Sequence, residues 1–252
     1  MRIEKPAPEQ VGQLLSLWKT AFGDHGGFWE MFLETGFRME RCRCVTEDGG
    51  VTAALYWFDC LCQAQKCAYL YAVVTHPEHR GRGLCRQLLE DTQKHLRKQG
   101  YASILLVPER DSLRQMYRRL GYRDCTSVTE FHCGAGKNRV PLRAIGPAEF
   151  AALRRELLPH GGVIQEEESL SFLEAQAAFF AGEGFLLAAY VDGNTLHGME
   201  LLGDQSAAPG IVAALDCKEG YFRSPGRDKP FAMIYPLTED AAAPEYFGLA
   251  FD

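Results

Sequence analysis

The stretch Arg80-Gly81-Arg82-Gly83-Leu84-Cys85 decides the fold of this chain. It separates an apolar run, Tyr69 to Val74, from an amphipathic stretch, Leu84 to Lys98. A strand that enters a short glycine and arginine loop and continues into a helix is suited to bind phosphate. Glycine lets backbone N–H groups approach an anion, and a helix N-terminus carries about half a positive charge. Arg80 and Arg82 can add charge-assisted hydrogen bonds.

A glycine-rich loop alone is weak support for phosphate binding. The chain has no G-x-x-x-x-G-K-[ST], which excludes an ordinary P-loop, and no G-x-G-x-x-G dinucleotide fingerprint. The alternative is a strand-to-helix turn in which glycine only relieves backbone strain. The sequence on both sides of the loop therefore has to decide between the two interpretations.

The segment from Tyr71 to Leu89 resembles the acetyl-CoA signature of the GCN5-related N-acetyltransferase (GNAT) superfamily, Arg/Gln-x-x-Gly-x-Gly/Ala after a Val-rich strand. Arg80 and Gly83 match the first position and the central glycine, whereas the last small position holds Cys85. Further along, Tyr117-Arg-Arg-Leu-Gly121-Tyr122 resembles the family's Tyr-x-x-x-Gly-Phe/Tyr motif. Two motifs in the expected order make coincidence a poor explanation.

The resemblance implies an α/β (α+β) fold with the mixed central sheet of the acyl-CoA N-acyltransferases. Hydrophobic periodicity and turn residues independently predict the order β-α-α-β-β-β-α-β-α in the first half. The predicted strands cover residues 2–5, 41–47, 51–62, 68–74 and 103–107. The first predicted helix begins at Pro8, and the other three cover 28–35, 84–99 and 112–120. In the third helix, Leu84, Leu88, Leu89 and Leu96 form the expected buried stripe.

The second half repeats this order without the loop. We divide the chain into a catalytic domain at 1–133, a linker at 134–141, and a smaller, degenerate GNAT-like domain at 142–252. The predicted elements are a strand at 142–145, a helix from Pro147, a helix at 172–180, a hairpin over 184–203, a short helix at 211–215 and strands at 221–222, 231–237 and 245–251. No Arg-x-x-Gly-x-Gly falls within 203–217. This second domain either forms one wall of the acceptor pocket or only stabilises the catalytic domain.

Composition narrows the class of protein. The 252 residues are 46% hydrophobic and 24% charged, which is typical of one large or two ordinary globular domains. No apolar run reaches the ~18 residues of a membrane span, so we expect a cytoplasmic protein without a membrane partner. A net charge of −6 without a Lys/Arg block argues against nucleic acid. Nine cysteines without C-x-x-C predict reduced structural thiols and no metal.

The resemblance also implies acetyl-CoA as co-substrate and assigns site residues. The loop would hold the phosphates through Arg80, Gly81, Arg82, Gly83, Leu84 and Cys85. The pantetheine arm would pair with the main chain of Val73, Val74 and Thr75. Tyr117 would protonate the leaving thiolate, since a phenol with a pKa of ~10 is protonated at neutral pH.

Two further residues are candidates on their position alone. Glu109 follows an apolar strand and could accept a proton from the amine, or be only a solvated carboxylate. Arg110 stands where many family members have asparagine, and either contacts the cofactor or faces solvent. We expect an N-acetyltransferase in which a primary amine of a small molecule or peptide attacks acetyl-CoA directly in a ternary complex. A non-catalytic acyl-CoA sensor, another acyl donor, and a monomeric or homodimeric state all stay open.

Overall fold

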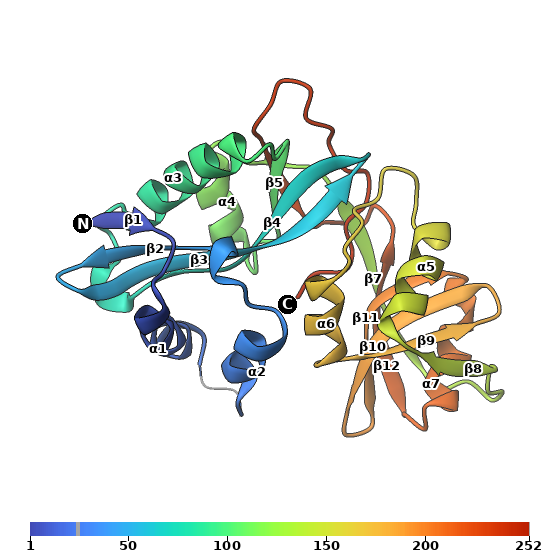
Figure 1. Cartoon of the computed structure of the whole chain (residues 1–252). Coiled ribbons are helices and arrows are strands. Elements are labelled where there is room, and N and C mark those ends of the chain that lie inside the picture. Colours follow the sequence, from blue (N-terminus) through green and yellow to red (C-terminus); the bar gives the residue numbers. More distant parts are fainter. Residues whose placement is uncertain (24–25, 252) are drawn as a thin grey trace. The chain divides into compact units, whose positions relative to one another are not determined.

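The computed structural model describes residues 1–23 and 26–251. Its residues gather into two compact units (Figure 1). The first comprises 1–106, 110–123 and 234–242, and the second comprises 107–109, 124–233 and 243–252. The division differs from the boundary drawn at residue 134, because each unit includes a segment from the other half of the sequence. In the part of the chain described, no helix is long and apolar enough to cross a membrane.

The first unit has the element order that the sequence predicts. Its elements are β1 (Arg2–Glu4), α1 (Val11–Phe22), α2 (Phe28–Thr35), β2 (Cys42–Glu47), β3 (Gly50–Cys62), β4 (Gln65–Thr75), α3 (Leu84–Lys98), β5 (Ser103–Leu106), α4 (Asp111–Arg119) and β6 (Arg123–Asp124). Short 3-10 turns, η1 (Pro8–Gln10), η2 (Met39–Arg41) and η3 (Pro77–His79), precede α1, β2 and the loop. Strands β1 to β4 are antiparallel, and β4 runs parallel to β5.

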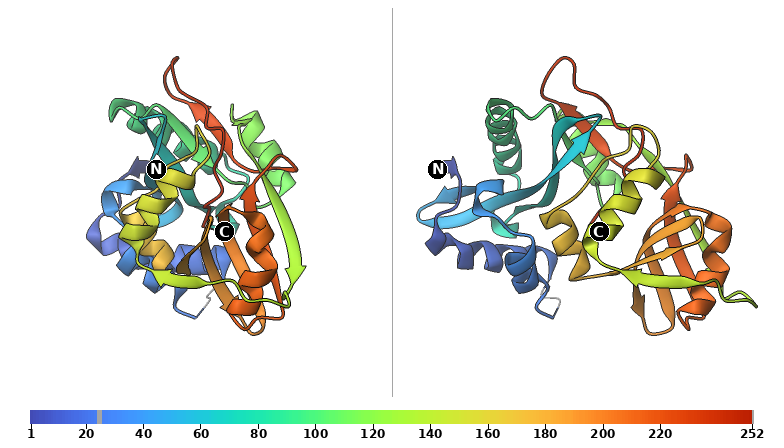
Figure 2. Two further views of the ribbon diagram at one scale, coloured as in Figure 1. Left: turned by 90° about the vertical axis from the view of Figure 1, so that its right-hand side faces the viewer. Right: turned by 45° about the vertical axis from the view of Figure 1, so that its right-hand side comes forward.

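The helices cover both faces of this sheet. Helix α3 lies on one face, and α1 and α2 lie on the other, as Figures 1 and 2 both show. All four leucines of the predicted stripe on α3 are buried, which confirms that prediction. Each fully buried leucine contributes about 1.5–3 kcal/mol relative to an exposed one. Burial of this stripe therefore fixes the start of α3 against the sheet.

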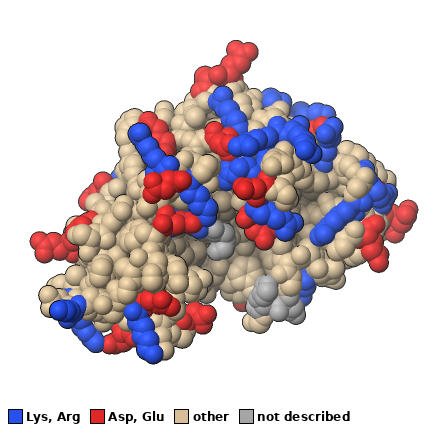
Figure 3. Space-filling view, turned by 180° about the vertical axis from the view of Figure 1, so that it is seen from behind, with Lys and Arg blue, Asp and Glu red and all other residues tan. Residues whose placement is uncertain are grey.

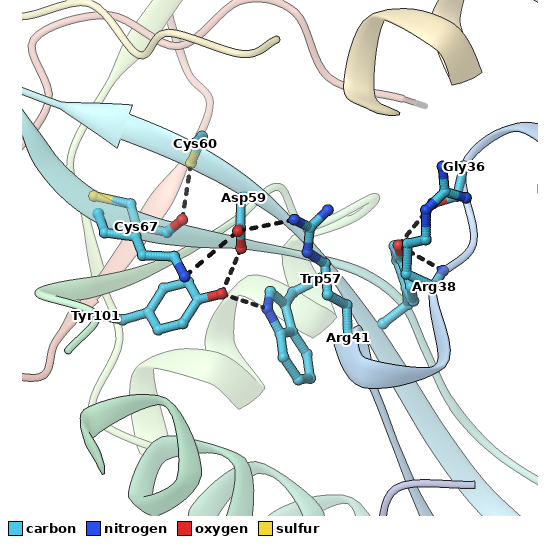
Figure 4. A network of polar contacts seen from close by, with 10 residues as sticks. Gly36, Arg38, Arg41, Trp57, Asp59, Cys60, Cys67 and Tyr101 are labelled. Carbon is cyan, nitrogen blue, oxygen red and sulfur yellow. Dashed lines mark hydrogen bonds and ion pairs between the residues drawn. The ribbon is translucent and has the colours of Figure 1, made fainter. Parts of the chain in front are cut away.

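A polar network lies within the same unit (Figure 4). The Tyr101 hydroxyl donates to Asp59 Oδ1 at 2.5 Å and accepts from Trp57 Nε1 at 3.1 Å. Arg41 Nη2 donates to Asp59 Oδ2 at 3.0 Å, and Lys66 Nζ lies 3.5 Å from the same oxygen. Burial, followed by the bond to Asp59, raises the pKa of Tyr101. The hydroxyl thus links β3 to the start of β5.

Replacing Tyr101 with phenylalanine is expected to lower the free energy of unfolding by about 1–3 kcal/mol, because the buried Trp57 N–H loses its acceptor. Urea unfolding measures the change. Tyr190→Phe is the matched control, since Tyr190 is 41% exposed and surface changes of this kind stay within about 0.5 kcal/mol. Equal stabilities for the two variants would contradict the proposed role of the hydroxyl.

The second unit repeats the plan of the first. Its elements are β7 (Ser127–Gly134), β8 (Leu142–Ile145), α5 (Pro147–Leu157), α6 (Glu168–Glu174), β9 (Ala178–Gly182), β10 (Phe185–Asp192), β11 (Thr195–Gly203), η4 (Gln205–Ala207), α7 (Ala208–Ala214), β12 (Glu219–Pro225) and β13 (Lys229–Pro230). The β10–β11 hairpin confirms the prediction over 184–203. Strands β11 and β12 are parallel, as β4 and β5 are. This unit therefore has the topology of a second copy.

The two seven-stranded sheets exchange one strand. The first has the order β1-β2-β3-β4-β5-β14-β6 and the second β13-β7-β12-β11-β10-β9-β8. Strand β14 (Met233–Pro236) thus completes the first sheet, and β7 occupies the equivalent place in the second. Read from β1 and from β8, the two orders match position by position. The internal duplication inferred from turn positions is visible in the strand order.

Two predicted elements of the second half are wrong. The helix expected at 172–180 ends at Glu174, and β9 begins at Ala178, because Phe179 and Phe180 pair with β10. The strand expected at 245–251 is a mostly buried segment outside the named strands, with an isolated bridge that joins Tyr246 to Gly162. Side chains take the place of a partner strand there: Gln165 Nε2 donates to the Leu249 carbonyl at 2.8 Å.

Cysteines fill parts of both cores. All nine are free thiols, and six of them are buried. Burial raises the pKa of the Cys42 and Cys44 thiols, which keeps them protonated. Within the described residues, no group of three or more His, Cys, Asp or Glu side chains could hold a metal ion.

Candidate functional site

The loop before α3 has the conformation that its glycines allow. Gly81 and Gly83 adopt φ values of 77° and 78°, in the left-handed region where a side chain is strained. A Cβ added at Gly81 would meet no atom within 4 Å, so the space beside it is open. Gly81, Arg82 and Gly83 are exposed. The glycines therefore serve both the backbone conformation and the access of a ligand.

Helix α3 directs its first backbone amides toward this loop. The first helical hydrogen bond runs from Gln87 N–H to the Gly83 carbonyl at 3.1 Å. The amides of Leu84, Cys85 and Arg86 precede it and have no acceptor within the helix. An anion at this end would meet these amides and the positive end of the helix dipole.

The two arginines of the loop contact different parts of the unit. Arg80 Nε donates to the Thr75 carbonyl at 3.2 Å, at the end of β4. Arg82 Nη1 and Nη2 donate to both oxygens of Glu47, each at 2.9 Å. No local pattern in the sequence connects Glu47 with the loop.

Strand β4 separates from β5 beside the loop. Its pairing with β3 continues to Thr75, whereas its pairing with β5 covers only Cys67, Ala68 and Tyr69. A register shift against β3 and a φ of 50° at Ala72 mark a bulge between these regions. Alternate main-chain groups from Val73 to Thr75 therefore lie on an edge that β5 does not cover. The Thr75 hydroxyl is also buried without a hydrogen-bond partner among the described residues.

The motif at 117–122 is a helix C-cap. The Tyr122 N–H donates to the Tyr117 carbonyl at 3.1 Å, and the Gly121 N–H to the Arg118 carbonyl at 3.1 Å. These are the two bonds of a Schellman motif, with Gly121 at φ 91° in the left-handed position. The rings of Tyr117 and Tyr122 pack edge to face with centroids 5.4 Å apart. The spacing Tyr-x-x-x-Gly-Tyr is thus explained by the geometry of a helix end.

Tyr117 lies close to the first turn of α3. Its side chain is 7% exposed, and its pKa is raised by burial and, secondarily, by the neighbouring Cys85 and Tyr122. Burial also raises the pKa of Cys85 to about 11. The two motifs that are separate in sequence therefore meet, and both side chains are neutral at pH 7.

Strand β14 packs against the C-cap through Tyr235. The Tyr235 and Tyr122 rings lie 5.2 Å apart between centroids. A Cβ at Gly121 would be 3.1 Å from Tyr235 Cε2, so glycine is needed there for space as well as for φ. Tyr235 is a residue that the sequence reasoning missed, because no local pattern connects it with residue 121.

Glu109 and Arg110 lie between β5 and α4, and both are exposed. Arg110 is the N-cap of α4, and its carbonyl accepts the amides of Leu113 and Arg114 at 3.0 and 3.1 Å. The catalytic role of Glu109 and the cofactor contact of Arg110 stay predictions.

Among its described residues, the second unit has no equivalent anion site after β11. After β11, the Asp204 side chain accepts the Ser206 N–H at 2.9 Å. Helix α7 has seven residues and carries Pro209 in its first turn, where proline removes one amide donor. An acidic group and a missing donor make this helix end unsuitable for phosphate.

The strand, loop and helix of this site belong to a fold that the comparisons identify. Residues 2–125 match the family model for the acetyltransferase (GNAT) domain. A GCN5-related N-acetyltransferase from Anabaena variabilis has a TM-score of 0.75 at 15% identity, over 94% of this chain and 73% of that one. One from Kribbella flavida has a TM-score of 0.71 at 18% identity, over 96% and 73%.

A tandem protein is also among the structures similar to this chain. A tandem GNAT protein from the clavulanic acid biosynthesis pathway has a TM-score of 0.55 at 13% identity, over 95% of this chain and all 100% of that chain. No curated protein matches the sequence. Residues 2–125 thus form a domain of the GNAT acetyltransferase family.

Proposed function

We propose that this chain transfers an acetyl group from acetyl-CoA to a primary amine of a small molecule or peptide, by direct attack within a ternary complex in the cytoplasm. The observation that carries the proposal is the convergence of three features in the first unit. They are the exposed glycine loop with the first amides of α3, the uncovered edge of β4, and the buried Tyr117 side chain, which is near enough to Cys85 for the two groups to interact electrostatically.

Each feature would supply one requirement of the reaction. The loop and the α3 amides would bind the pyrophosphate, and Arg80 would add a charge-assisted hydrogen bond. The open edge of β4 would pair with the amides of the pantetheine arm, as one strand pairs with another. The bulge at Ala72 turns main-chain groups toward that edge, where an amide could stabilise the carbonyl oxygen of the thioester.

Tyr117 would act on the leaving sulfur. Its pKa lies above that of a free phenol because it is buried, so it is protonated throughout the physiological range. A free thiol has a pKa of ~8.5, so full transfer of the phenolic proton to a thiolate is uphill. The hydroxyl would therefore stabilise the developing thiolate mainly by donating a hydrogen bond.

This assignment predicts the pH profile. We expect kcat to rise with pH as the attacking amine loses its proton, with no decline up to about pH 10 from ionisation of Tyr117. Initial rates of thiol release between about pH 6 and about pH 10 test it. A declining limb in this range that the Tyr117→Phe variant lacks would show that Tyr117 titrates with a lower pKa than its burial indicates.

Thiol release from acetyl-CoA with a panel of amines tests the function itself. Calorimetry with coenzyme A should show binding, and at least one amine should accelerate thiol release. Tight binding without turnover on any amine would instead support the acyl-CoA sensor.

Acidic and basic side chains are interspersed on the face shown in Figure 3, and a cationic acceptor would not be repelled by a net charge of −6.

A further inference from the structure

We propose that Glu47 is a positioning residue for the phosphate loop, and that Arg82 holds this loop in shape instead of binding phosphate. The inference rests on the proposed function, because it assigns roles within the coenzyme A site. Glu47 is the last residue of β2, directly before the turn at Asp48 and Gly49. It therefore belongs to the sheet, whereas Arg82 belongs to an exposed loop.

The contact between Glu47 and Arg82 is two-pronged. Both terminal nitrogens of Arg82 donate to the carboxylate, each at 2.9 Å. Such a fork fixes the orientation of the guanidinium as well as its distance. The Glu47 side chain is 16% exposed and the Arg82 side chain 50%, so water screens the charges from the Arg82 side. The two-pronged geometry, more than the charge, therefore holds the loop.

His79 adds a third contact. Its Nδ1 lies 2.8 Å from Arg82 Nη1 and 3.4 Å from Glu47 Oε2. Because Nη1 is a donor, Nδ1 accepts from it in the neutral imidazole. The loop is thus attached at Arg82 to both the end of β2 and the turn η3.

Arg80 has a different environment. Its contact with the Thr75 carbonyl uses Nε, which leaves the terminal nitrogens of the fork for an anion. The two arginines therefore have different roles: Arg80 binds phosphate, and Arg82 fixes the backbone between Gly81 and Gly83. A loop with glycine on both sides of Arg82 loses conformational freedom on binding, and an existing contact reduces that loss.

The sign of one substitution separates the two roles. If Arg82 bound phosphate, Glu47 would compete for it and repel the anion, and Glu47→Gln would tighten binding. If Arg82 instead holds the loop in place through Glu47, Glu47→Gln releases the loop and weakens the binding of coenzyme A. Glu78→Gln is the matched control, because it removes one exposed negative charge from the neighbouring turn η3 without touching the Glu47–Arg82 contact.

Calorimetry on the full chain with coenzyme A tests the proposal. We expect Glu47→Gln and Arg82→Gln each to raise Kd by about fivefold, and the double variant to raise it no further, since one contact is lost in all three. Glu78→Gln should leave Kd unchanged or slightly lower. In the kinetic assay the Glu47 and Arg82 variants should raise the KM of acetyl-CoA by the same factor, whereas Glu78→Gln, which lies outside the contact, should keep the wild-type KM and kcat.

A Kd that falls or stays constant in Glu47→Gln would overturn the inference. Should that variant fail to fold, Glu47→Asp replaces it. Aspartate keeps the negative charge but is too short to form the two-pronged contact with Arg82. A raised Kd therefore supports the loop-holding role of Arg82, and a wild-type or lower Kd contradicts it. Failure of the wild type to bind coenzyme A would overturn the proposed function instead, so the two failures are distinguishable.

Discussion

Tyr117→Phe is expected to lower kcat by about 10²- to 10³-fold, which is the usual effect of removing a proton donor from a transition state. The Kd of acetyl-CoA should change little, because the loop and β4 are untouched. The phenylalanine ring keeps the edge-to-face contact with Tyr122, so the helix end should stay folded. Thiol release at saturating amine measures kcat, and calorimetry measures Kd.

The neighbouring tyrosine provides the control. Tyr122 is 3% exposed and belongs to the same helix cap, so Tyr122→Phe removes a buried hydroxyl without touching the proposed donor. We expect less than a tenfold change in kcat there. If the two variants retain equal turnover, Tyr117 is a core residue and the leaving thiolate takes its proton from water.

Local features were predictable from sequence because short stretches determine them. The αL glycines of the loop, the leucine stripe of α3 and the turns after β2 and β10 depend on residues a few positions apart. The Schellman cap likewise follows from the spacing of Tyr117 and Gly121. The phosphate loop and the candidate proton donor could thus be placed on the correct elements.

Long-range pairing could not be predicted in the same way. The segments at 127–134 and 233–236 both form strands, but their composition does not state which sheet each joins. A positive φ at Ala72, where no glycine marks the bulge, leaves no trace in the sequence. Glu47 lies 35 residues before Arg82, which it contacts, and Tyr235 lies 114 residues after Gly121. Hydrophobic periodicity relates residues only a few positions apart, so it could not connect these pairs.

The second large effect follows from the exchanged strand. A fragment ending at residue 133 is expected neither to fold stably nor to bind coenzyme A, although it contains both motifs. It lacks β14, which lies between β5 and β6 in the first sheet. Ile234 on this strand and Leu237 directly after it belong to the first unit and are both buried. Losing two such side chains costs about 3–6 kcal/mol, which is comparable to the ~5–15 kcal/mol that stabilises a domain.

The same fragment also keeps most of β7 without its partners β12 and β13, so an unpaired strand edge would promote aggregation. Circular dichroism and calorimetry on residues 1–133 measure folding and binding. The matched control is a full chain cleaved within the exposed segment 137–139 through an inserted protease site. Because each sheet keeps a strand from the other half, the two pieces should elute together and bind coenzyme A with the affinity of the intact chain. A fragment 1–133 that binds as tightly as the cleaved pair would show that the first sheet closes without β14, and Tyr235 would then have no role at the helix cap.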